Sequence, residues 1–344
     1  MLKEMKPLIG KVLTALGPED PSVLGNVLMH EHLYADIYDG EKDRMIWEET
    51  PLAPERRKYL FDDAVPLLKE CREKHGLRAF CDATTPPFRA WPDVYEEMTR
   101  ATGVHAILST GSYREIETGT YMVKTPDRAI WPFVRESPVG ELADFFIREI
   151  VEGLHGSRVR TGCIKLASSQ APMTEAEAKA FRAGARAQKA TGVHVTTHCT
   201  ILGAETSQLT ILDSEGVDLR RVIVGHTAGH LMDKTYRRTV IEWMKRGASF
   251  MPTNLDVAQP ERWQPLIDAI HAVFDAGHGD KLFFGMDHGY GTERGRFERM
   301  WFMPPPPFLY MFDAVLPAFR RMGLTAEEER TIMAVNPRRI IPVQ

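Results

Sequence analysis

The chain has 344 residues, of which 43% are hydrophobic and 26% are charged, as is ordinary for a folded globular protein. The formal net charge of -4 argues against a nucleic acid or a membrane surface as partner, because both select basic protein faces. The sequence contains no run of about 18 or more apolar residues, and its N-terminus lacks the pattern of a signal peptide. We therefore expect a cytoplasmic protein with neither kind of partner.

Four cysteines, Cys71, Cys81, Cys163 and Cys199, are spread along the chain, and none forms a CxxC pair. Such a pair would have suggested a metal or redox site. We expect four buried, reduced thiols.

A short apolar run followed by an amphipathic helical pattern recurs along the whole chain. The runs are 26–30, 78–82, 105–110, 162–166, 193–198, 221–226, 248–252 and 281–286. Their composition is typical of strands that are buried on both faces. Eight alternations of strand and helix favour a closed TIM (β/α)8 barrel of the α/β class, forming a single domain over residues 1–344.

Helices are predicted between these runs. Thr174 and Glu177 fit a capping box that opens a helix to about Ala190, with Gly192 as its C-terminal cap. Further helices are expected at 144–154, 231–246 and 265–276, where apolar residues follow the helical period.

Several runs end in residues that bind metals, and the C-terminal ends of barrel strands meet at one mouth. His30 and His32 end the first run two positions apart, so both side chains can face the barrel interior. The fifth, sixth and eighth runs end in His198, His226 and Asp287. Imidazole and carboxylate ligands together suit Zn²⁺, Mn²⁺, Co²⁺ or Fe²⁺.

Lys165 lies inside the fourth apolar run. A buried lysine is unusual unless it is paired or neutralised. One interpretation is a salt bridge to an acidic residue of the barrel. The other is a carbamate, formed by addition of CO₂ to the amine, whose two oxygens can bridge two metal ions that stabilise its negative charge.

The residues around these positions form a series of short sequence motifs. In chain order the motifs are GPED, LGNVLMHEH, GCIKLASS, TGVHVTTH, VIVGHTAGH, GMDHG and NPRRII. Together with the order of the metal-binding residues, they resemble the phosphotriesterase family of the amidohydrolase superfamily, from about Gly10 to Ile341. Several independent motifs in the family's order make the resemblance specific.

The resemblance implies a binuclear centre with two divalent ions per chain, zinc foremost and manganese, cobalt or iron as alternatives. His30, His32 and Asp287 would hold the more buried ion, and His198 and His226 the more exposed one. Lys165, as N6-carboxylysine, would bridge the two ions. A bridging hydroxide would attack the substrate, and Asp287 would take up its proton. The family also suggests a homodimer.

The resemblance says less about the substrate. The stretch from Thr110 to Tyr113 resembles the lactonase branch, in which a tyrosine contacts the hydroxide or orients the substrate; a core tyrosine is the alternative. His288, Arg294 and Trp301 are candidate substrate-binding residues, and their alternatives are hydrogen-bonded loop positions, a dimer contact or a solvated loop. His230 also lies next to a ligand motif. Like His288, it is either a residue of the substrate pocket or a hydrogen-bonded loop histidine.

The seventh strand departs from the family pattern at Met251–Asn254. Family phosphotriesterases use a histidine there and an aspartate after strand six as a proton relay. These positions hold Asn254 and Gly229 in this chain, and the arginine typical of many lactonases is also missing. The departure predicts that the relay is absent.

Three functions remain open at this point. The first is a metal-dependent hydrolase of lactones or other carboxylic esters, with organophosphate hydrolysis as a weak side reaction. The second keeps the metal centre and cleaves an amide, carbamate or phosphoester. The third is a non-catalytic binding protein of the same fold, which the complete set of expected metal ligands disfavours.

Overall fold

The computed structural model describes residues 1–35, 51–86, 88–115, 131–258, 260–293, 296–300 and 304–344, with the backbone alone for 292, 293 and 296. Two of the candidate substrate residues, Arg294 and Trp301, therefore lie outside the described side chains. Within this part of the chain, no helix has the length and apolar character needed to cross a membrane.

The elements alternate in the predicted manner. The strands are β1 (Val12–Thr14), β2 (Gly17–Glu19), β3 (Asn26–Ala35), β4 (Leu77–Asp82), β5 (His105–Gly111), β6 (Thr161–Ala167), β7 (His194–His198), β8 (Val222–Gly225), β9 (Ser249–Met251), β10 (Gly289–Glu293) and β11 (Arg296–Arg299). The helices are α1 (Pro54–His75), α2 (Pro92–Thr102), α3 (Trp131–Glu136), α4 (Val139–Val151), α5 (Glu175–Thr191), α6 (Ala204–Ser214), α7 (Ala228–Met232), α8 (Lys234–Lys245), α9 (Gln264–Asp275), α10 (Leu316–Arg321), α11 (Ala326–Arg330) and α12 (Asn336–Ile340).

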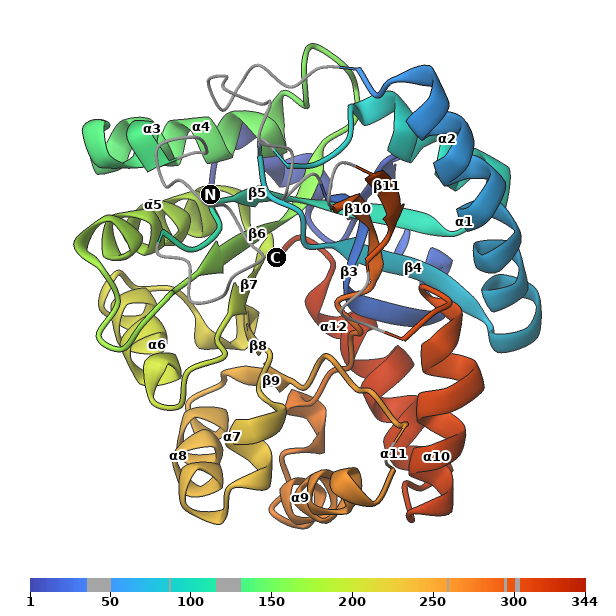
Figure 1. Ribbon diagram of the computed structural model, residues 1–344. Helices are drawn as coiled ribbons and strands as arrows, with labels where there is room; N and C mark the ends of the chain where they lie inside the picture. The colour runs from blue at the N-terminus through green and yellow to red at the C-terminus, as the bar shows by residue number, and fades with distance from the viewer. Residues whose placement is uncertain (36–50, 87, 116–130, 259, 294–295, 301–303) are drawn as a thin grey trace.

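Seven parallel strands, β3 to β9, lie side by side in chain order, with helices around them (Figure 1). The stretch 281–286 closes the ring through backbone hydrogen bonds to both neighbours. Phe283 N donates to Phe250 O of β9, and Met29 N of β3 donates to Phe284 O. The predicted α/β barrel is therefore present. Its eighth strand is irregular, since a bridge between Leu282 and Phe250 is the one regular pairing assigned to it.

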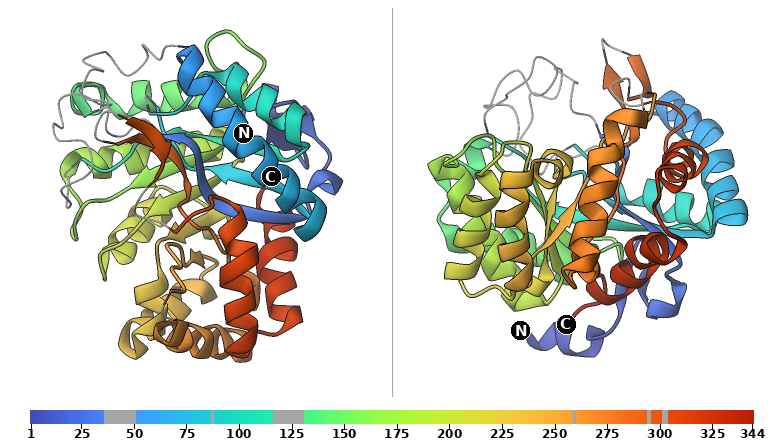
Figure 2. Two further views of the ribbon diagram at one scale, coloured as in Figure 1. Left: turned by 45° about the vertical axis from the view of Figure 1, so that its right-hand side comes forward. Right: turned by 90° about the horizontal axis from the view of Figure 1, so that it is seen from below.

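Beyond the ring, β10 and β11 extend the sheet over the mouth. β10 pairs in parallel with β3, where Gly289 lies opposite His32, and in antiparallel fashion with β11. The sequence indicated only a long loop here. At the other end of the molecule, the two chain termini lie close together (Figure 2).

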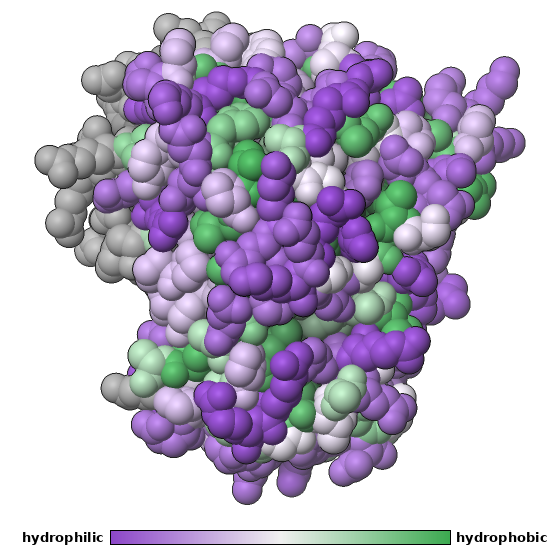
Figure 3. Space-filling model, turned by 90° about the vertical axis from the view of Figure 1, so that its right-hand side faces the viewer, coloured by the Kyte–Doolittle hydropathy of each residue, from purple (hydrophilic) through white to green (hydrophobic). Residues whose placement is uncertain are grey.

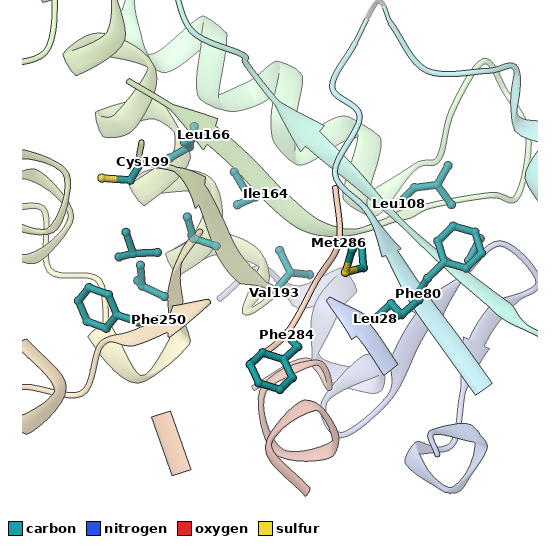
Figure 4. Packing of buried hydrophobic residues seen from close by; sticks show 14 of the residues in the cluster. Leu28, Phe80, Leu108, Ile164, Leu166, Val193, Cys199, Phe250, Phe284 and Met286 are labelled. Atoms are coloured by element: carbon teal, nitrogen blue, oxygen red, sulfur yellow. The ribbon is translucent and has the colours of Figure 1, made fainter. Parts of the chain in front are cut away.

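The strands separate two apolar layers. The inner layer fills the barrel and includes Val27, Met29, Ile223, Met251 and Phe283. The outer layer packs the strands against the helices and includes the residues labelled in Figure 4. Cys199, at the end of β7, belongs to this outer layer, with its thiol directed toward the surrounding helices (Figure 4).

A register shift in β3 aims two histidines into the barrel. Val27 and Met29 belong to the inner layer, so strict alternation would send His30 outward. The pairing of β3 with β4 shifts between Leu28 and Glu31, and such a bulge re-aims the side chains that follow it. His30 consequently lines the barrel mouth.

Glu31, on the opposite side of β3, stabilises the irregular eighth strand. Its carboxyl oxygens accept hydrogen bonds from Met286 N at 2.8 Å and His288 N at 3.0 Å. These two backbone donors are thereby satisfied without a regular ladder, as buried amides require. The carboxyl group fixes the backbone on both sides of Asp287.

The helices confirm the local signals with two exceptions. The helix expected at 144–154 is α4, which begins earlier, at Val139, and ends at Val151. Thr174 and Glu177 form the predicted capping box of α5, and Gly192 ends that helix at a φ of 76°. The helix expected at 231–246 is instead two helices, α7 and α8. Asp233 separates them because its side chain caps α8 by accepting from the backbone N–H groups of Thr235 and Tyr236.

The outer surface of the barrel is polar. Along α1, Leu60, Ala64, Leu68 and Cys71 are buried and leave charged residues on the opposite side. The face of the molecule in Figure 3 is accordingly mostly hydrophilic, with hydrophobic residues scattered among polar ones. All four cysteines are buried free thiols, as expected.

Candidate metal centre

The structure brings the six predicted ligand residues into one cluster at the barrel mouth. Asp287 Oδ1 lies 2.9 Å from His32 Nε2 and 3.4 Å from His30 Nε2. Asp287 Oδ2 lies 3.9 Å from His226 Nδ1. The rings of His226 and His198 are 4.2 Å apart between centroids. Four strand ends, far apart in sequence, therefore supply neighbouring donor atoms.

Lys165 is the sixth member, and its Nζ lies 3.2 Å from His30 Nε2. The side chain comes from β6 and is 1% exposed. Burial lowers the pKa of this amine to about 7, against the opposing effect of the nearby Asp287 carboxylate. A large fraction of the amine is therefore neutral near pH 7, and a neutral amine is the form that reacts with CO₂.

A chain of hydrogen bonds through Thr253 and Asn254 connects His226 to Asp287. Thr253 Oγ1 lies 2.6 Å from His226 Nδ1 and donates to Asn254 Oδ1 at 2.7 Å. Asn254 Nδ2 donates to Asp287 Oδ2 at 3.1 Å. These directions are mutually consistent if His226 Nδ1–H donates to Thr253, which leaves a lone pair on His226 Nε2.

His32 is held in the same manner from the neighbouring strand. Its Nδ1 lies 2.7 Å from Thr84 Oγ1, just beyond the end of β4. Contacts of this kind fix the ring orientation of metal-binding histidines and leave the other nitrogen for the metal. Two of the four histidines therefore have their Nδ1 atoms engaged by the surrounding protein.

The cluster stores backbone strain. His226, Asn254 and Asp287 adopt φ values of 62°, 57° and 63°. Residues other than glycine occupy this region rarely and at an energetic cost, and such residues concentrate at functional sites. The three strained residues belong to one hydrogen-bonded group, so the fold tolerates strain where it orients these side chains.

Burial keeps the imidazoles neutral. It lowers the pKa of His226 to about 4 and lowers the pKa values of His30 and His198 well below the ordinary value. For Asp287, burial opposes ionisation, but the neighbouring His226 ring and hydrogen bonds from His30 and His32 bring its pKa below the ordinary range. Neutral imidazoles and a carboxylate are the protonation states that metal ligation requires.

The donor set fits divalent metal ions. His198 Nε2 and His226 Nε2 are buried and have no hydrogen-bond partner among the described residues. Buried polar atoms are ordinarily satisfied, so two orphaned imidazole nitrogens beside a carboxylate point to ligands outside the protein. His30, His226 and Asp287 also place one donor atom each within 4.8 Å of one another.

A pocket opens over this cluster. His30, His32, His198 and Asp287 form part of its wall. The remaining lining residues are Ala83, Thr84, Thr85, Phe88, Tyr113 and Met300. A mainly apolar wall with a few convergent polar groups is typical of small-molecule sites.

The candidate substrate residues are distributed unequally around this cavity. Tyr113 lines it, with its ring centroid 5.4 Å from that of His198. His288 is 2% exposed, does not line the cavity, and meets Tyr310 edge-on at 5.9 Å. His230 lies outside the cavity wall, beside Cys199 and Glu205.

The sequence did not identify the residues that orient the candidate ligands. Thr84 and Thr253 were not singled out, Asn254 was noted only as a departure from the family pattern, and none of the three has a side chain typical of a primary metal ligand. Their position directly after the second and seventh apolar runs was the available signal. Phe88 and Met300 line the cavity from loops, where an apolar side chain carries no signal of function in the sequence.

Comparison with known proteins agrees with this geometry. The model of the phosphotriesterase family matches residues 10–341. The chain is 27% identical over 343 residues to aryldialkylphosphatase from Saccharolobus solfataricus, covering 97% of this chain and 98% of the relative. It is 24% identical over 362 residues to N-acetyltaurine hydrolase from Tetraodon nigroviridis, covering 97% and 98%.

Among solved structures, the organophosphorus hydrolase from Deinococcus radiodurans superposes with a TM-score of 0.78 at 24% identity, covering 98% of both chains. This likeness supports the fold. Because the family match spans nearly the whole chain, this protein belongs to the phosphotriesterase family.

Proposed function

We propose that this protein is a metal-dependent hydrolase that cleaves lactones or other carboxylic esters, with organophosphates as weaker substrates. The observation that carries the proposal is the convergence of four imidazoles, one carboxylate and one buried lysine beneath a pocket.

We propose that these residues hold two divalent ions, zinc foremost. His30, His32 and Asp287 would bind one ion, and His198 and His226 the other. Such ions supply Lewis acidity, which acidifies water and polarises a substrate oxygen. Lys165 would be carboxylated: its neutral amine adds to CO₂ and loses one proton, and the resulting anion suits a place between two cations.

Asp287 is the group that would move a proton. It is ionised, and its carboxylate is oriented by Asn254 Nδ2 on one side and His32 on the other. Ester cleavage releases an alkoxide that needs a proton. A carboxylate held between the metal ligands and the cavity can take a proton from the attacking water and deliver it to that oxygen.

The cavity wall supports a substrate with an apolar body. Ala83, Phe88 and Met300 provide apolar contacts, while Thr84, Thr85 and Tyr113 provide hydroxyl groups. Tyr113, opposite His198, would orient the carbonyl group over the centre. This combination suits an acyl chain attached to an ester or lactone.

A substrate panel tests the proposal. The Zn²⁺, Mn²⁺ and Co²⁺ forms of the purified protein are assayed with lactones, aryl esters, a phosphotriester and N-acyl amides, with His226→Ala as the inactive control. Turnover of lactones or esters above the phosphotriester, lost in His226→Ala, supports the proposal. Failure of all three forms on every lactone and ester overturns it. Selective turnover of amides would instead establish an amide hydrolase, the alternative to which the name of one family relative, N-acetyltaurine hydrolase, points.

A further inference from the structure

A second cluster of metal-binding side chains lies behind the barrel mouth, outside the cavity. It consists of Cys199 directly after β7, Glu205 in the first turn of α6 and His230 in α7. Each side chain offers one donor atom, and the three atoms lie within 4.8 Å of one another. Their residues are 1%, 0% and 1% exposed. None of the three lines the substrate cavity.

Cys199 and His198 are neighbours in sequence but face opposite sides of the barrel wall. His198 lines the mouth, whereas Cys199 belongs to the outer layer between strands and helices, as Figure 4 shows. Successive side chains of a strand alternate in this way. The second cluster is therefore separated from the proposed binuclear centre by the barrel wall.

The donor atoms of this cluster all lie close to one nitrogen, Nε2 of His230. His230 Nε2 lies 3.2 Å from Glu205 Oε2, 3.3 Å from the carbonyl oxygen of Ile201 and 3.8 Å from Cys199 Sγ. Cys199 Sγ lies 3.8 Å from the same carbonyl oxygen. One imidazole N–H can serve only one of these acceptors. Glu205 Oε2 accepts no hydrogen bond of regular geometry among the described residues, although His230 Nε2 lies 3.2 Å away. The single N–H of His230 therefore cannot satisfy all the acceptors of the cluster.

These separations match the spacing of ligands around one tetrahedral ion. With zinc–sulfur bonds of about 2.3 Å and zinc–nitrogen or zinc–oxygen bonds of about 2.0 Å, neighbouring N and O ligands lie about 3.3 Å apart and S and N ligands about 3.6 Å apart. The observed spacings agree within a few tenths of an ångström. A thiolate with an imidazole selects zinc over magnesium or calcium.

We propose that Cys199, Glu205, His230 and the carbonyl oxygen of Ile201 form a third metal site, which binds one zinc ion and is structural. On binding, the Cys199 thiol loses its proton to solvent, and the thiolate and carboxylate balance the charge of the ion. Four protein ligands leave no open position, as in structural zinc sites.

A cysteine nucleophile served by a histidine and a glutamate does not fit this arrangement. In a catalytic triad the base contacts the nucleophile through one ring nitrogen and its orienting acid through the other. Here Cys199 and Glu205 both face Nε2 of His230. With all three side chains buried, a substrate has no access to the thiol.

The site would tie together two loops that carry metal ligands of the mouth. Cys199 directly follows His198, and His230 lies four positions after His226. A zinc ion bound between them would fix the loops after β7 and β8 from the outside. This role is independent of the reaction proposed above, so the site can be tested without a substrate.

Cobalt substitution tests the proposal on the full chain. The protein is freed of metal with a chelator and titrated with Co²⁺, while bound metal and the near-ultraviolet spectrum are measured. Because the proposed binuclear centre contains no cysteine, a thiolate-to-cobalt charge-transfer band reports the third site alone. We expect this band in the wild type, its loss together with one bound ion in Cys199→Ser, and its retention in Cys71→Ser, which alters a buried thiol of α1.

Absence of the band in the cobalt-saturated wild type, or its survival in Cys199→Ser, overturns the proposal. Zinc X-ray absorption on the wild-type chain covers the case in which Cys199→Ser does not fold. One sulfur ligand among the bound zinc ions is expected there, and a shell of nitrogen and oxygen alone contradicts the site. Loss of the ions at the barrel mouth would leave the cobalt–thiolate band in place, which separates the two centres.

Discussion

Lys165 Nζ and His30 Nε2 lie 3.2 Å apart inside the barrel mouth, although 135 positions separate the two residues in the sequence. Burial is the main cause that lowers the pKa of both groups, and that of Lys165 falls to about 7. An ammonium group would repel metal ions here, whereas a carbamate would attract them. We therefore propose that metal binding depends on carboxylation of Lys165.

Replacing Lys165 with alanine should therefore remove bound metal and activity together. We expect a loss of activity above about 100-fold, beyond the range usual for residues that merely support a ligand. Propionate at high concentration should restore part of both, because its carboxylate can occupy the space of the missing side chain. Metal analysis and ester turnover check this, with the exposed Lys69→Ala as control. Full metal content in Lys165→Ala would refute the bridging role.

Asp287→Asn should separate metal binding from proton transfer. The amide oxygen can still bind a metal ion, but the group can no longer accept a proton. We expect turnover to fall on the order of 100-fold or more, with part of the metal retained. Turnover and metal content are measured in parallel, and Asp268→Asn on the exposed face of α9 is the matched control. A fully active Asp287→Asn would show that the assigned proton transfer is wrong.

Asn254 is predicted to act through His226 and Asp287, which its side chain connects. Asn254→Gly keeps the positive φ of 57° accessible and deletes the amide, so folding stability should change little. Metal affinity or turnover should fall about 10- to 100-fold, as for other groups that orient metal ligands. Thermal unfolding and turnover are compared. Unchanged kinetics in a correctly folded Asn254→Gly would exclude the orienting role.

Folding stability should decrease in mild acid because of His194. Burial, aided by the charge of Arg221, lowers its pKa to about 3, whereas the unfolded chain protonates at about 6.5. Between these values the unfolded state binds more protons, so the free energy of unfolding falls as the pH falls, by up to about 1.4 kcal/mol per pH unit for this group.

Urea unfolding of the metal-free protein at about pH 7 and about pH 5 measures this change. His194→Gln should reduce the pH dependence, and His278→Gln, at a partly exposed position, should leave it unchanged. An identical pH dependence in wild type and His194→Gln would contradict the assignment.

The convergence of the candidate ligands was predictable because each lies in or directly after an apolar run, and barrel topology places the ends of all strands at one mouth. The local change in β3 that turns His30 inward was not predictable. Alternation from Val27 and Met29 sends it outward, and the shift of register before Glu31 that corrects this depends on pairing with β4. The irregular eighth strand has the same origin, since Glu31 satisfies its backbone donors from across the sheet.

The residues that hold the ligands were hidden for a related reason. Asn254 was recognised only as a departure from the family pattern. Its role depends on contacts with both His226 and Asp287, which only the folded chain brings within reach. Thr84 contacts a histidine 52 positions away on the neighbouring strand. The helix at 231–246 was predicted as continuous because its apolar period continues through Asp233, which acts instead as a cap.

The most direct test of the central claim is anomalous diffraction at the zinc absorption edge from crystals of the zinc-loaded protein. We expect two peaks at the barrel mouth, one beside His30, His32 and Asp287 and one beside His198 and His226, with additional electron density on Lys165 Nζ between them. A mouth with no peak or a single peak, and with Lys165 as an unmodified amine, would contradict it.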